Sequence, residues 1–318
     1  MSHLMSAPDV ARAFGLGSPT AELNFVARGA MGEVFRLDTE DGPVAVKRLL
    51  WGPSGDEEAN AAFQYAAADA GVRMARPLPT TNGDVLKRLG DGWWRAYEWV
   101  EGTHVPVGDS APATVAAAVA RNLGTLHSLK YDTGEPVDGW FTGVGDDQIA
   151  AALDAAGSVG VDVTGARRAL AGLGPIARMR PNETPVGCHN DPDRGNVIVG
   201  AADGSVALID WDNAGSNCPA SELAGALWQW SNGSDSEVVA AMVRAYRDAG
   251  GVFEPSGLEV FAPVCAAWVN YAVSCCLHLV DDRIDAGTLA FERPVVDQLA
   301  NYDVTVATLE RILEMVPA

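Results

Sequence analysis

The feature that most constrains the fold is a change of pattern near Gly102. Before it, short runs of β-forming residues alternate with turn signals such as Asp41-Gly42. After it, apolar residues recur at helical spacing, as at Val115, Val119, Leu123 and Leu126. The sequence therefore predicts an α+β chain with two lobes: a sheet-based N-lobe (residues 1–100) and a mainly helical C-lobe (residues 101–318).

The N-lobe pattern predicts a five-stranded antiparallel sheet with one helix. The helix is expected over residues Asp56 to Ala70, which are rich in Ala, Glu and Gln. The five expected strands are Asn24–Ala27, Glu33–Leu37, Val44–Leu49, Asp84–Leu89 and Trp93–Val100. In the C-lobe, we expect one helix opened by Ser110 and Pro112 and another over about residues 235–248.

A β-hairpin is predicted in the middle of the C-lobe sequence. Two apolar runs, Val197–Val199 and Val206–Ile209, flank a turn that contains Asp203-Gly204. This pairing would place Asn196 and Asp210 across from each other at the open end of the hairpin. Asp191 lies one short loop earlier in the chain.

The three polar residues of this segment suit phosphoryl transfer. Carboxylate and amide oxygens are the hard ligands that Mg²⁺ prefers, together with phosphate and water. In such a reaction the protein mainly positions the reactants, neutralises phosphate charge and accepts a hydroxyl proton. The alternative is an ordinary hairpin with solvated polar ends, because a single Asp is usually a surface residue. The combined spacing of Asp191, Asn196 and Asp210 favours the metal site.

The segment also resembles a known family. His189-x-Asp191-x4-Asn196, followed by a strand ending in Ile-Asp210-Trp-Asp212, resembles the aminoglycoside phosphotransferase and choline kinase family, which has the bilobal protein-kinase-like fold. The resemblance implies that Asp191 is the catalytic base, that Asn196 and Asp210 bind Mg²⁺, and that ATP or GTP is the donor. Asp212 could assist a second metal or the substrate, or be structural, and His189 is expected to be a packing residue.

The N-lobe supplies the expected nucleotide contacts. Val44-Ala45-Val46-Lys47 matches the kinase strand whose lysine holds the α- and β-phosphates, although a lone strand lysine is usually a solvated charge. Strand alternation places Ala45 and Lys47 on one face. Gly29 and Gly32 flank a short loop whose backbone N–H groups could cover phosphates, or which could be a plain β-turn.

Two further nucleotide contacts are expected from the resemblance. A helical glutamate should orient Lys47; Glu57 and Glu58 are both available, and Glu58 is preferred. Residues 97–102 look like the hinge between the lobes. The backbone C=O of Glu98 and N–H of Val100 would then pair with adenine.

The acceptor is expected to be a small, cationic hydroxyl compound. The formal net charge of −20 argues against nucleic acid and anionic membranes as partners. The short stretch between Asp210 and Glu222 leaves no room for the activation segment of a kinase with protein substrates. The resemblance favours an aminoglycoside or related antibiotic; choline, homoserine and sugars are alternatives. A non-catalytic pseudokinase is disfavoured because Lys47 and the three polar residues above are intact.

Carboxylates and tryptophan faces bind ammonium groups, and the C-lobe offers several of each. The candidates for acceptor contacts are Glu222, Asp235, Glu237, Asp281, Asp282, Asp285, Trp228, Trp230 and Trp268.

We expect a cytoplasmic enzyme with no membrane partner. The five cysteines show no metal-binding or paired spacing, which fits reduced thiols. The stretch from Val260 to Val280 is uncharged and long enough to span a bilayer, but polar residues such as Asn270 interrupt it. A buried core helix is therefore expected there.

Overall fold

The computed structural model describes residues 5–53, 55–106, 111–301 and 304–317. The chain divides into two compact units. The first consists of Met1–His104 and Val197–Asp212, and the second of Val105–Asn196 and Asn213–Ala318. The sequence pattern placed a single boundary after residue 100, whereas the first unit also takes in the segment with the predicted hairpin.

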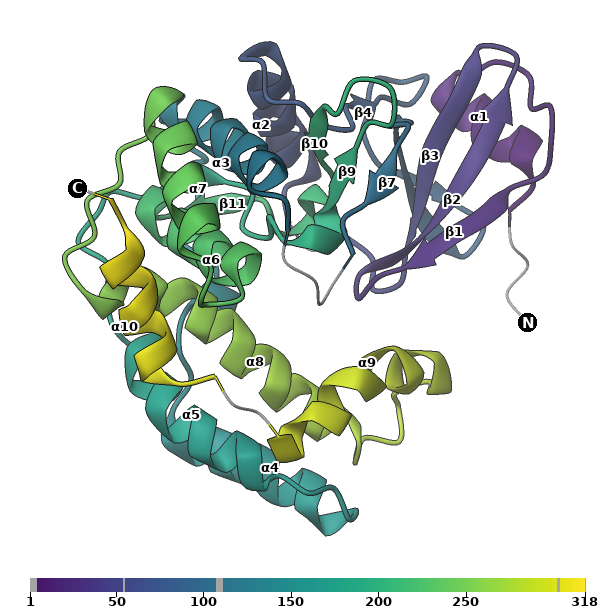
Figure 1. Cartoon of the computed structure of the whole chain (residues 1–318). Coiled ribbons are helices and arrows are strands. Elements are labelled where there is room, and N and C mark those ends of the chain that lie inside the picture. The colour runs from purple at the N-terminus through teal and green to yellow at the C-terminus, as the bar shows by residue number, and fades with distance from the viewer. Residues whose placement is uncertain (1–4, 54, 107–110, 302–303, 318) are drawn as a thin grey trace. The chain divides into compact units, whose positions relative to one another are not determined.

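The first unit is built on a six-stranded antiparallel sheet. Its strands are β1 (Asn24–Arg28), β2 (Gly32–Thr39), β3 (Gly42–Leu49), β4 (Pro77–Leu78), β5 (Lys87–Leu89) and β6 (Gly92–Glu98). The order is β1-β2-β3-β6-β4, with β5 also paired to β6. Strands β1, β2 and β3 lie side by side in Figure 1. All five expected strands are present. The predicted count of five is wrong because β4 contains only two residues, too few to give a periodic pattern.

A helix that the sequence analysis did not predict covers one face of this sheet. Helix α1 (Ala7–Phe14) begins after Ser6, whose side chain accepts from the Asp9 N–H. Its apolar side chains pack on alternate residues of β2, β3 and β6, which form one core cluster: Ala7, Val10, Ala11, Phe14, Phe35, Leu37, Val44, Val46, Trp94 and Ala96. The sheet therefore presents its other residues, including Lys47, on the opposite face.

The remainder of the first unit consists of helix α2 (Glu57–Asp69) and a small sheet of β7 (Thr103–His104), β9 (Val197–Val199) and β10 (Val206–Leu208). β9 and β10 pair antiparallel with Val197 opposite Leu208, so the predicted hairpin is present. The Leu208 N–H donates to the Arg73 carbonyl at 2.8 Å, which ties β10 to the segment after α2.

The second unit is mainly helical. Its helices are α3 (Ala113–Ser128), α4 (Asp146–Ser158), α5 (Thr164–Ala177), α6 (Pro219–Ser231), α7 (Ser236–Asp248), α8 (Ala262–His278), α9 (Ala286–Gln298) and α10 (Val306–Met315). Its strands β8 (Val186–Cys188) and β11 (Gly215–Asn217) form an antiparallel pair. The described residues also form five short 3₁₀ turns: η1 (Gly139–Phe141), η2 (Arg194–Asn196), η3 (Trp211–Asn213), η4 (Leu258–Phe261) and η5 (Leu299–Asn301).

Helices α3 and α7 match the helices expected from the sequence. Asp235, where the second was expected to begin, caps α7 by accepting from the N–H groups of Glu237 and Val238. Pro112 is the residue before α3. Ser110, the other residue expected to open α3, lies outside the described residues.

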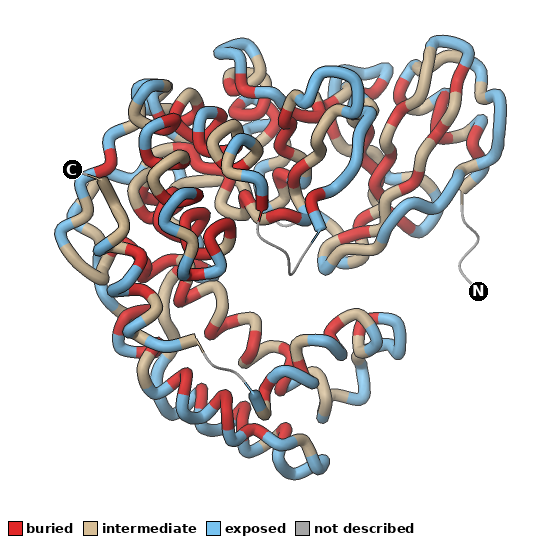
Figure 2. Tube along the Cα trace, in the orientation of Figure 1, coloured by how far each residue is buried: buried red, intermediate tan, exposed pale blue. Residues whose placement is uncertain are grey.

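Helix α8 and the turn before it form a segment that is long and apolar enough to cross a membrane, by length and composition alone. Leu258–His278 has 21 residues and a mean hydropathy of 1.7, and 56% of its most apolar window is buried inside the protein. Burial runs along α8 in Figure 2, and its neighbours include α4, α5 and α6. Core helices of soluble proteins pass the same test of length and composition.

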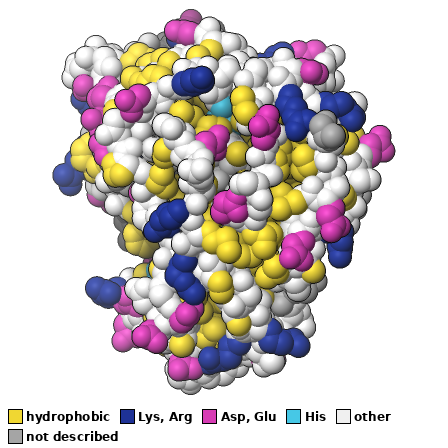
Figure 3. All heavy atoms as spheres, turned by 90° about the vertical axis from the view of Figure 1, so that its left-hand side faces the viewer, with side chains coloured by type: hydrophobic (Ala, Val, Ile, Leu, Met, Phe, Trp, Pro, Cys, Tyr) yellow, Lys and Arg dark blue, Asp and Glu magenta, His cyan; other side chains and the backbone are white. Residues whose placement is uncertain are grey.

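The surface carries charges of both signs. On the face drawn in Figure 3, Lys and Arg side chains are interspersed with Asp and Glu side chains, with hydrophobic atoms between them.

Candidate active site

Lys47 is the central cation of the first unit. As expected from strand alternation, Val44 and Val46 point into the α1 core, and Lys47 lies on the other face of β3. Lys47 is only 5% exposed, and its Nζ lies 2.8 Å from Asp210 Oδ1 and 2.7 Å from Asp212 Oδ2. Burial alone would lower the pKa of Lys47, but the two carboxylates outweigh it and hold the pKa above its ordinary value. The lysine therefore stays charged.

The expectation that Glu58 orients Lys47 is wrong. Glu58 Oε1 accepts from the Val85 backbone N–H at 3.1 Å, and the partners of Lys47 are the two aspartates. The neighbouring Glu57 pairs instead with Arg95. The physical reason is that Asp210 and Asp212 already neutralise Lys47, while Glu58 serves a backbone N–H and Glu57 serves Arg95, which lies opposite Lys47 on β6.

The backbone at Asp210 adopts a conformation that is unusual for a residue with a side chain. Its φ of +58° lies in the left-handed region, which most residues avoid. The turn η3 follows at once, and Trp211 is buried against Phe63 of α2, with ring centroids 5.9 Å apart. This anchor fixes the turn with both aspartates facing Lys47. Such strain is characteristic of functional sites.

The loop between β1 and β2 covers Lys47. The Gly29 N–H donates to the Gly32 carbonyl at 2.8 Å, which closes a tight turn. A Cβ on Gly32 would lie 2.7 Å from the Arg48 carbonyl and 2.8 Å from Lys47 Cε, so only glycine fits there. A Cβ on Gly29 would lie 3.9 Å from Asp210 Oδ2, an ordinary contact. The two predicted glycines therefore lie beside the lysine and the aspartate that are expected to serve the nucleotide.

The predicted hinge follows β6. The Glu98 N–H donates to the Arg76 carbonyl at 2.9 Å, and Val100 is half-buried just beyond the strand. Gly102 has a φ of +156°, and a Cβ on it would lie 2.3 Å from the Val199 carbonyl, so a side chain is excluded here. The pairing of Glu98 and Val100 with adenine stays a prediction.

The loop that carries Asp191 belongs to the second unit. Asn190 has a φ of +69°, and its side-chain amide donates to the Asn213 carbonyl at 2.9 Å and accepts from Asn217 Nδ2 at 2.8 Å. Asn213 Nδ2 in turn lies 3.3 Å from Asp191 Oδ2. A set of asparagine amides therefore fixes the backbone around Asp191 and orients its carboxylate.

Asn196 is oriented in a way that suits a metal ligand. Its Nδ2 donates to the Asp191 carbonyl at 3.0 Å, and its backbone N–H donates to Asp193 at 3.0 Å. The side-chain nitrogen is thus the donor in the loop, and the side-chain oxygen is the group that could serve a metal. An amide oxygen and the carboxylate of Asp210 fit Mg²⁺ in chemistry. Asn196 is the last residue of the second unit before β9, and Asp210 follows β10 in the first unit. Their joint role as ligands stays a prediction.

Glu222, at the start of α6, fixes the same loop from inside the second unit. Its carboxylate accepts from the backbone N–H groups of His189 and Asn190, and lies 2.5 Å from His127 Nε2 on α3. The other ring nitrogen of His127 is 2.8 Å from the Tyr246 hydroxyl on α7. Burial would raise the pKa of Glu222, but the hydrogen bond and charge of His127 and the backbone donor hold it below its ordinary value.

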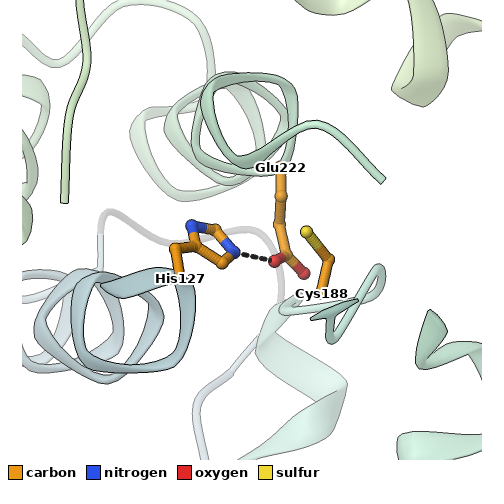
Figure 4. Close-up of side chains that lie close together, drawn as sticks. All are labelled: His127, Cys188 and Glu222. Carbon is orange, nitrogen blue, oxygen red and sulfur yellow. Dashed lines mark hydrogen bonds and ion pairs between the residues drawn. The ribbon is translucent and has the colours of Figure 1, made fainter. Parts of the chain in front are cut away.

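His127, Cys188 and Glu222 also meet the distance criterion for a metal site. Figure 4 shows the three side chains converging, with their ligand atoms all within 4.8 Å of one another. Both nitrogens of the imidazole already have protein partners, however, and burial together with Glu222 raises the pKa of the Cys188 thiol well above its ordinary value. The cluster is therefore a hydrogen-bonded support for the loop, with His189 in the packing position expected of it.

Several expected acceptor contacts have other roles. Glu222 and Trp230 are buried, and their polar atoms bond within the second unit: Glu222 bonds His127 and the Asp191 loop, and Trp230 Nε1 donates to the Pro192 carbonyl. Asp285 caps α9, and Asp281 pairs with Arg283 at 2.6 Å. Sequence reasoning also missed Arg95, whose only signal was its place opposite Lys47 in the sheet.

Comparison with known proteins was made for sequence and for structure. A family model described as the phosphotransferase enzyme family matches residues 22–261. A search of curated proteins finds no match.

Three solved structures illustrate the likeness in fold. The spectinomycin phosphotransferase APH(9)-Ia, in complex with ADP and spectinomycin, superposes with a TM-score of 0.66 at 13% identity over 98% of both chains. Amicoumacin kinase hAmiN, in complex with AMP-PNP and Ca²⁺, gives 0.61 at 14% identity over 92% of this chain and 91% of that one. Choline kinase from Cryptosporidium parvum Iowa II gives 0.52 at 12% identity over 92% and 88%.

Proposed function

Because the chain belongs to the phosphotransferase enzyme family, we propose that it moves the γ-phosphate of ATP onto a hydroxyl of a small, amine-bearing molecule such as an aminoglycoside or related antibiotic. Family membership confirms the resemblance drawn from the Asp191–Asn196 motif, the kinase-like α+β fold and the assignment as a phosphotransferase enzyme. The acceptor and the roles of individual residues belong to the proposal.

One observation carries the proposal most directly. Lys47 and Asp210, 163 residues apart, form an ion pair of 2.8 Å in the first unit. A buried lysine beside a carboxylate, under a tight glycine loop, is the arrangement that nucleotide phosphates and their metal require. A non-catalytic binding module would have no need to retain Asp191 and its network of asparagines as well.

The proposed roles follow the chemistry of each side chain. When bound, Mg²⁺ neutralises the charge on the phosphates, and Asn196 and Asp210 are its proposed ligands. Lys47 holds the α- and β-phosphates as a cation that stays protonated. Asp191 orients the acceptor hydroxyl and takes its proton as the phosphoryl group is transferred. The asparagine amides around Asp191 keep the carboxylate in place for that step.

The acceptor is proposed to be cationic because the chain has a formal net charge of −20, which attracts amines. An antibiotic acceptor would make this activity a resistance function. All five cysteines are free thiols, which supports a location in the reducing cytoplasm.

The test is a screen of acceptors by ADP release. Amino-sugar and peptide antibiotics form one panel, and choline, homoserine and simple sugars form the second; ATP and GTP are compared as donors, with and without Mg²⁺. We expect turnover with a member of the amine-bearing panel. Turnover only with neutral sugars would overturn the proposed acceptor class, and nucleotide binding without turnover on either panel would favour a pseudokinase.

A further inference from the structure

Two buried cations lie side by side on the first unit's sheet. Lys47 on β3 and Arg95 on β6 are direct partners in the antiparallel ladder, and they are 5% and 7% exposed. Like charges opposite each other in a sheet destabilise it, and a buried charge needs a partner of opposite sign. The pair therefore needs negative charge close to both cationic heads.

Asp212 is that anion. Its Oδ1 lies 2.9 Å from Arg95 Nη1, and its Oδ2 lies 2.7 Å from Lys47 Nζ, so each carboxylate oxygen faces one cation. The side chain of Asp212 is 8% exposed, whereas that of Asp210 is 35% exposed. The two aspartates of the Asp-Trp-Asp segment thus differ in burial and in their partners. Asp212 is enclosed between two cations, and Asp210 is open to solvent and to ligands.

Glu57 of α2 completes the cluster on the far side of Arg95. The charges alternate in sign along the row Asp210, Lys47, Asp212, Arg95 and Glu57. The helix carboxylate therefore acts on the lysine indirectly, through one arginine and one aspartate. This row of five residues is called the ion row below.

We propose that Asp212 and Arg95 are positioning residues that hold Lys47 for the nucleotide phosphates, with Glu57 as the outer anchor, and that Asp212 is not a metal ligand. The inference rests on the proposed kinase function and deepens it. If Asp210 served a metal ion, Lys47 would keep a buried partner in Asp212. Arg95 balances the charge of Asp212, so that the lysine remains available to phosphate.

The first arm of the test follows Lys47 itself and needs no activity. The nucleotide-free protein is treated with an amine-reactive reagent, and modification of Lys47 is measured by mass spectrometry. Asp212→Asn and Arg95→Met should increase the labelling rate of Lys47 several-fold, and Glu57→Gln should increase it less. Glu58→Gln is the matched control, because Glu58 is adjacent on α2 but bonds Val85. Equal labelling in all variants would overturn the positioning role, whether or not the protein is a kinase.

The second arm measures nucleotide affinity by calorimetry, with the Mg²⁺ concentration varied. Asp212→Asn should weaken ATP binding about 10- to 100-fold, from the loss of the buried ion pair with Lys47, at every Mg²⁺ concentration. Asp210→Asn should instead raise the Mg²⁺ concentration needed for binding. If Asp212→Asn raises it in the same way, Asp212 is a metal ligand and the inference is wrong.

A purely structural role has its own signature. If Asp212→Asn lowers only the melting temperature, with ATP affinity and Lys47 labelling unchanged, the positioning role is overturned. Because removing a buried anion can prevent folding, Glu57→Gln provides the second variant: it lies at the outer end of the ion row and leaves both partners of Lys47 in place. Wild-type protein that binds no nucleotide would contradict the proposed function, while the labelling arm would still decide the inference.

Discussion

Two residues with left-handed backbone, Asn190 and Asp210, lie beside the groups to which we assign chemistry. Asn190 immediately precedes the proposed base, and Asp210 is the proposed metal ligand. A side chain in this region costs on the order of 1 kcal/mol or more, so the surroundings must hold it there. Buried groups do so in both units: Glu222 under Asn190, and Trp211 after Asp210.

The support beneath Asn190 makes a prediction for stability. The folded-state pKa of Glu222 is below its ordinary value of 4.5, so its contribution is complete above that pH and is lost as the pH falls through the folded-state pKa. Glu222→Gln should lower the free energy of unfolding by about 1–3 kcal/mol at neutral pH. It should also flatten the acid limb of the stability profile.

Denaturant unfolding of wild type and Glu222→Gln between neutral and acid pH measures this effect. Glu183→Gln is a useful comparison, because burial raises the pKa of Glu183 and its contribution should have the opposite pH dependence. An unchanged acid limb in Glu222→Gln would show that its carboxylate does not carry the support.

The sequence motif identified some residues of the candidate site and could not identify others. The motif identified Asp191, Asn196, Asp210 and Lys47 as candidates. It could not decide between Glu57 and Glu58, because adjacent helical residues differ by about 100° in direction and the rotation of the helix is set by packing. Arg95 was missed because its position opposite Lys47 depends on the strand register, which the sequence pattern does not give.

At the scale of elements, the loop between β1 and β2 depends on close approach to β3. Gly32→Ala would put a Cβ 2.7 Å from the Arg48 carbonyl, so we expect a loss of about 1–3 kcal/mol in the free energy of unfolding. Displacement of Lys47 should also weaken ATP binding.

Gly29→Ala is the matched variant in the same loop. Its Cβ would make only ordinary contacts of 3.8 and 3.9 Å, so the change in stability should be within about 0.5 kcal/mol. Thermal and denaturant unfolding of both variants tests the comparison. A larger loss for Gly29→Ala than for Gly32→Ala would contradict the geometry of the loop.

The contact between α3 and α7 gives a second comparison between glycines. A Cβ on Gly124 would lie 2.5 Å from the Tyr246 carbonyl, so Gly124→Ala should separate the helices and cost about 1–3 kcal/mol. Gly157 in α4 has open space, and Gly157→Ala should stabilise by about 0.4–1 kcal/mol. Urea unfolding measures both, and a stable Gly124→Ala variant would show that the packing tolerates separation.

Elements marked by apolar runs together with turn or capping residues were predictable from the sequence. The hairpin of β9 and β10 and helix α7 follow directly from apolar runs, turn residues and a capping aspartate. Strand β4 was missed because two residues carry no periodicity. Helix α1 was missed although Ser6 offers a cap and Ala7, Val10, Ala11 and Phe14 recur at helical spacing.

At the scale of the whole molecule, the sequence pattern indicated the change from strands to helices near Gly102. It did not indicate that a later segment of the chain belongs to the first unit. The segment Val197–Asp212 follows the Asp191 loop directly, yet it is part of the first unit with Lys47. The proposed base and the amide ligand therefore come from one unit, and the lysine and the carboxylate ligand from the other. The pairing of β9 with β7 ties this segment to the first unit, and local patterns do not report such pairing between distant segments.

The central claim is that Asp191 accepts the proton of an acceptor hydroxyl while the nucleotide is held by other residues. A single-turnover reaction with ATP carrying a labelled γ-phosphate, run with the acceptor found in the screen, tests it directly when wild type and Asp191→Asn are compared at equal nucleotide occupancy. We predict that Asp191→Asn binds Mg²⁺-ATP as wild type does and transfers the label about 10²- to 10⁴-fold more slowly. Transfer at the wild-type rate would contradict the account.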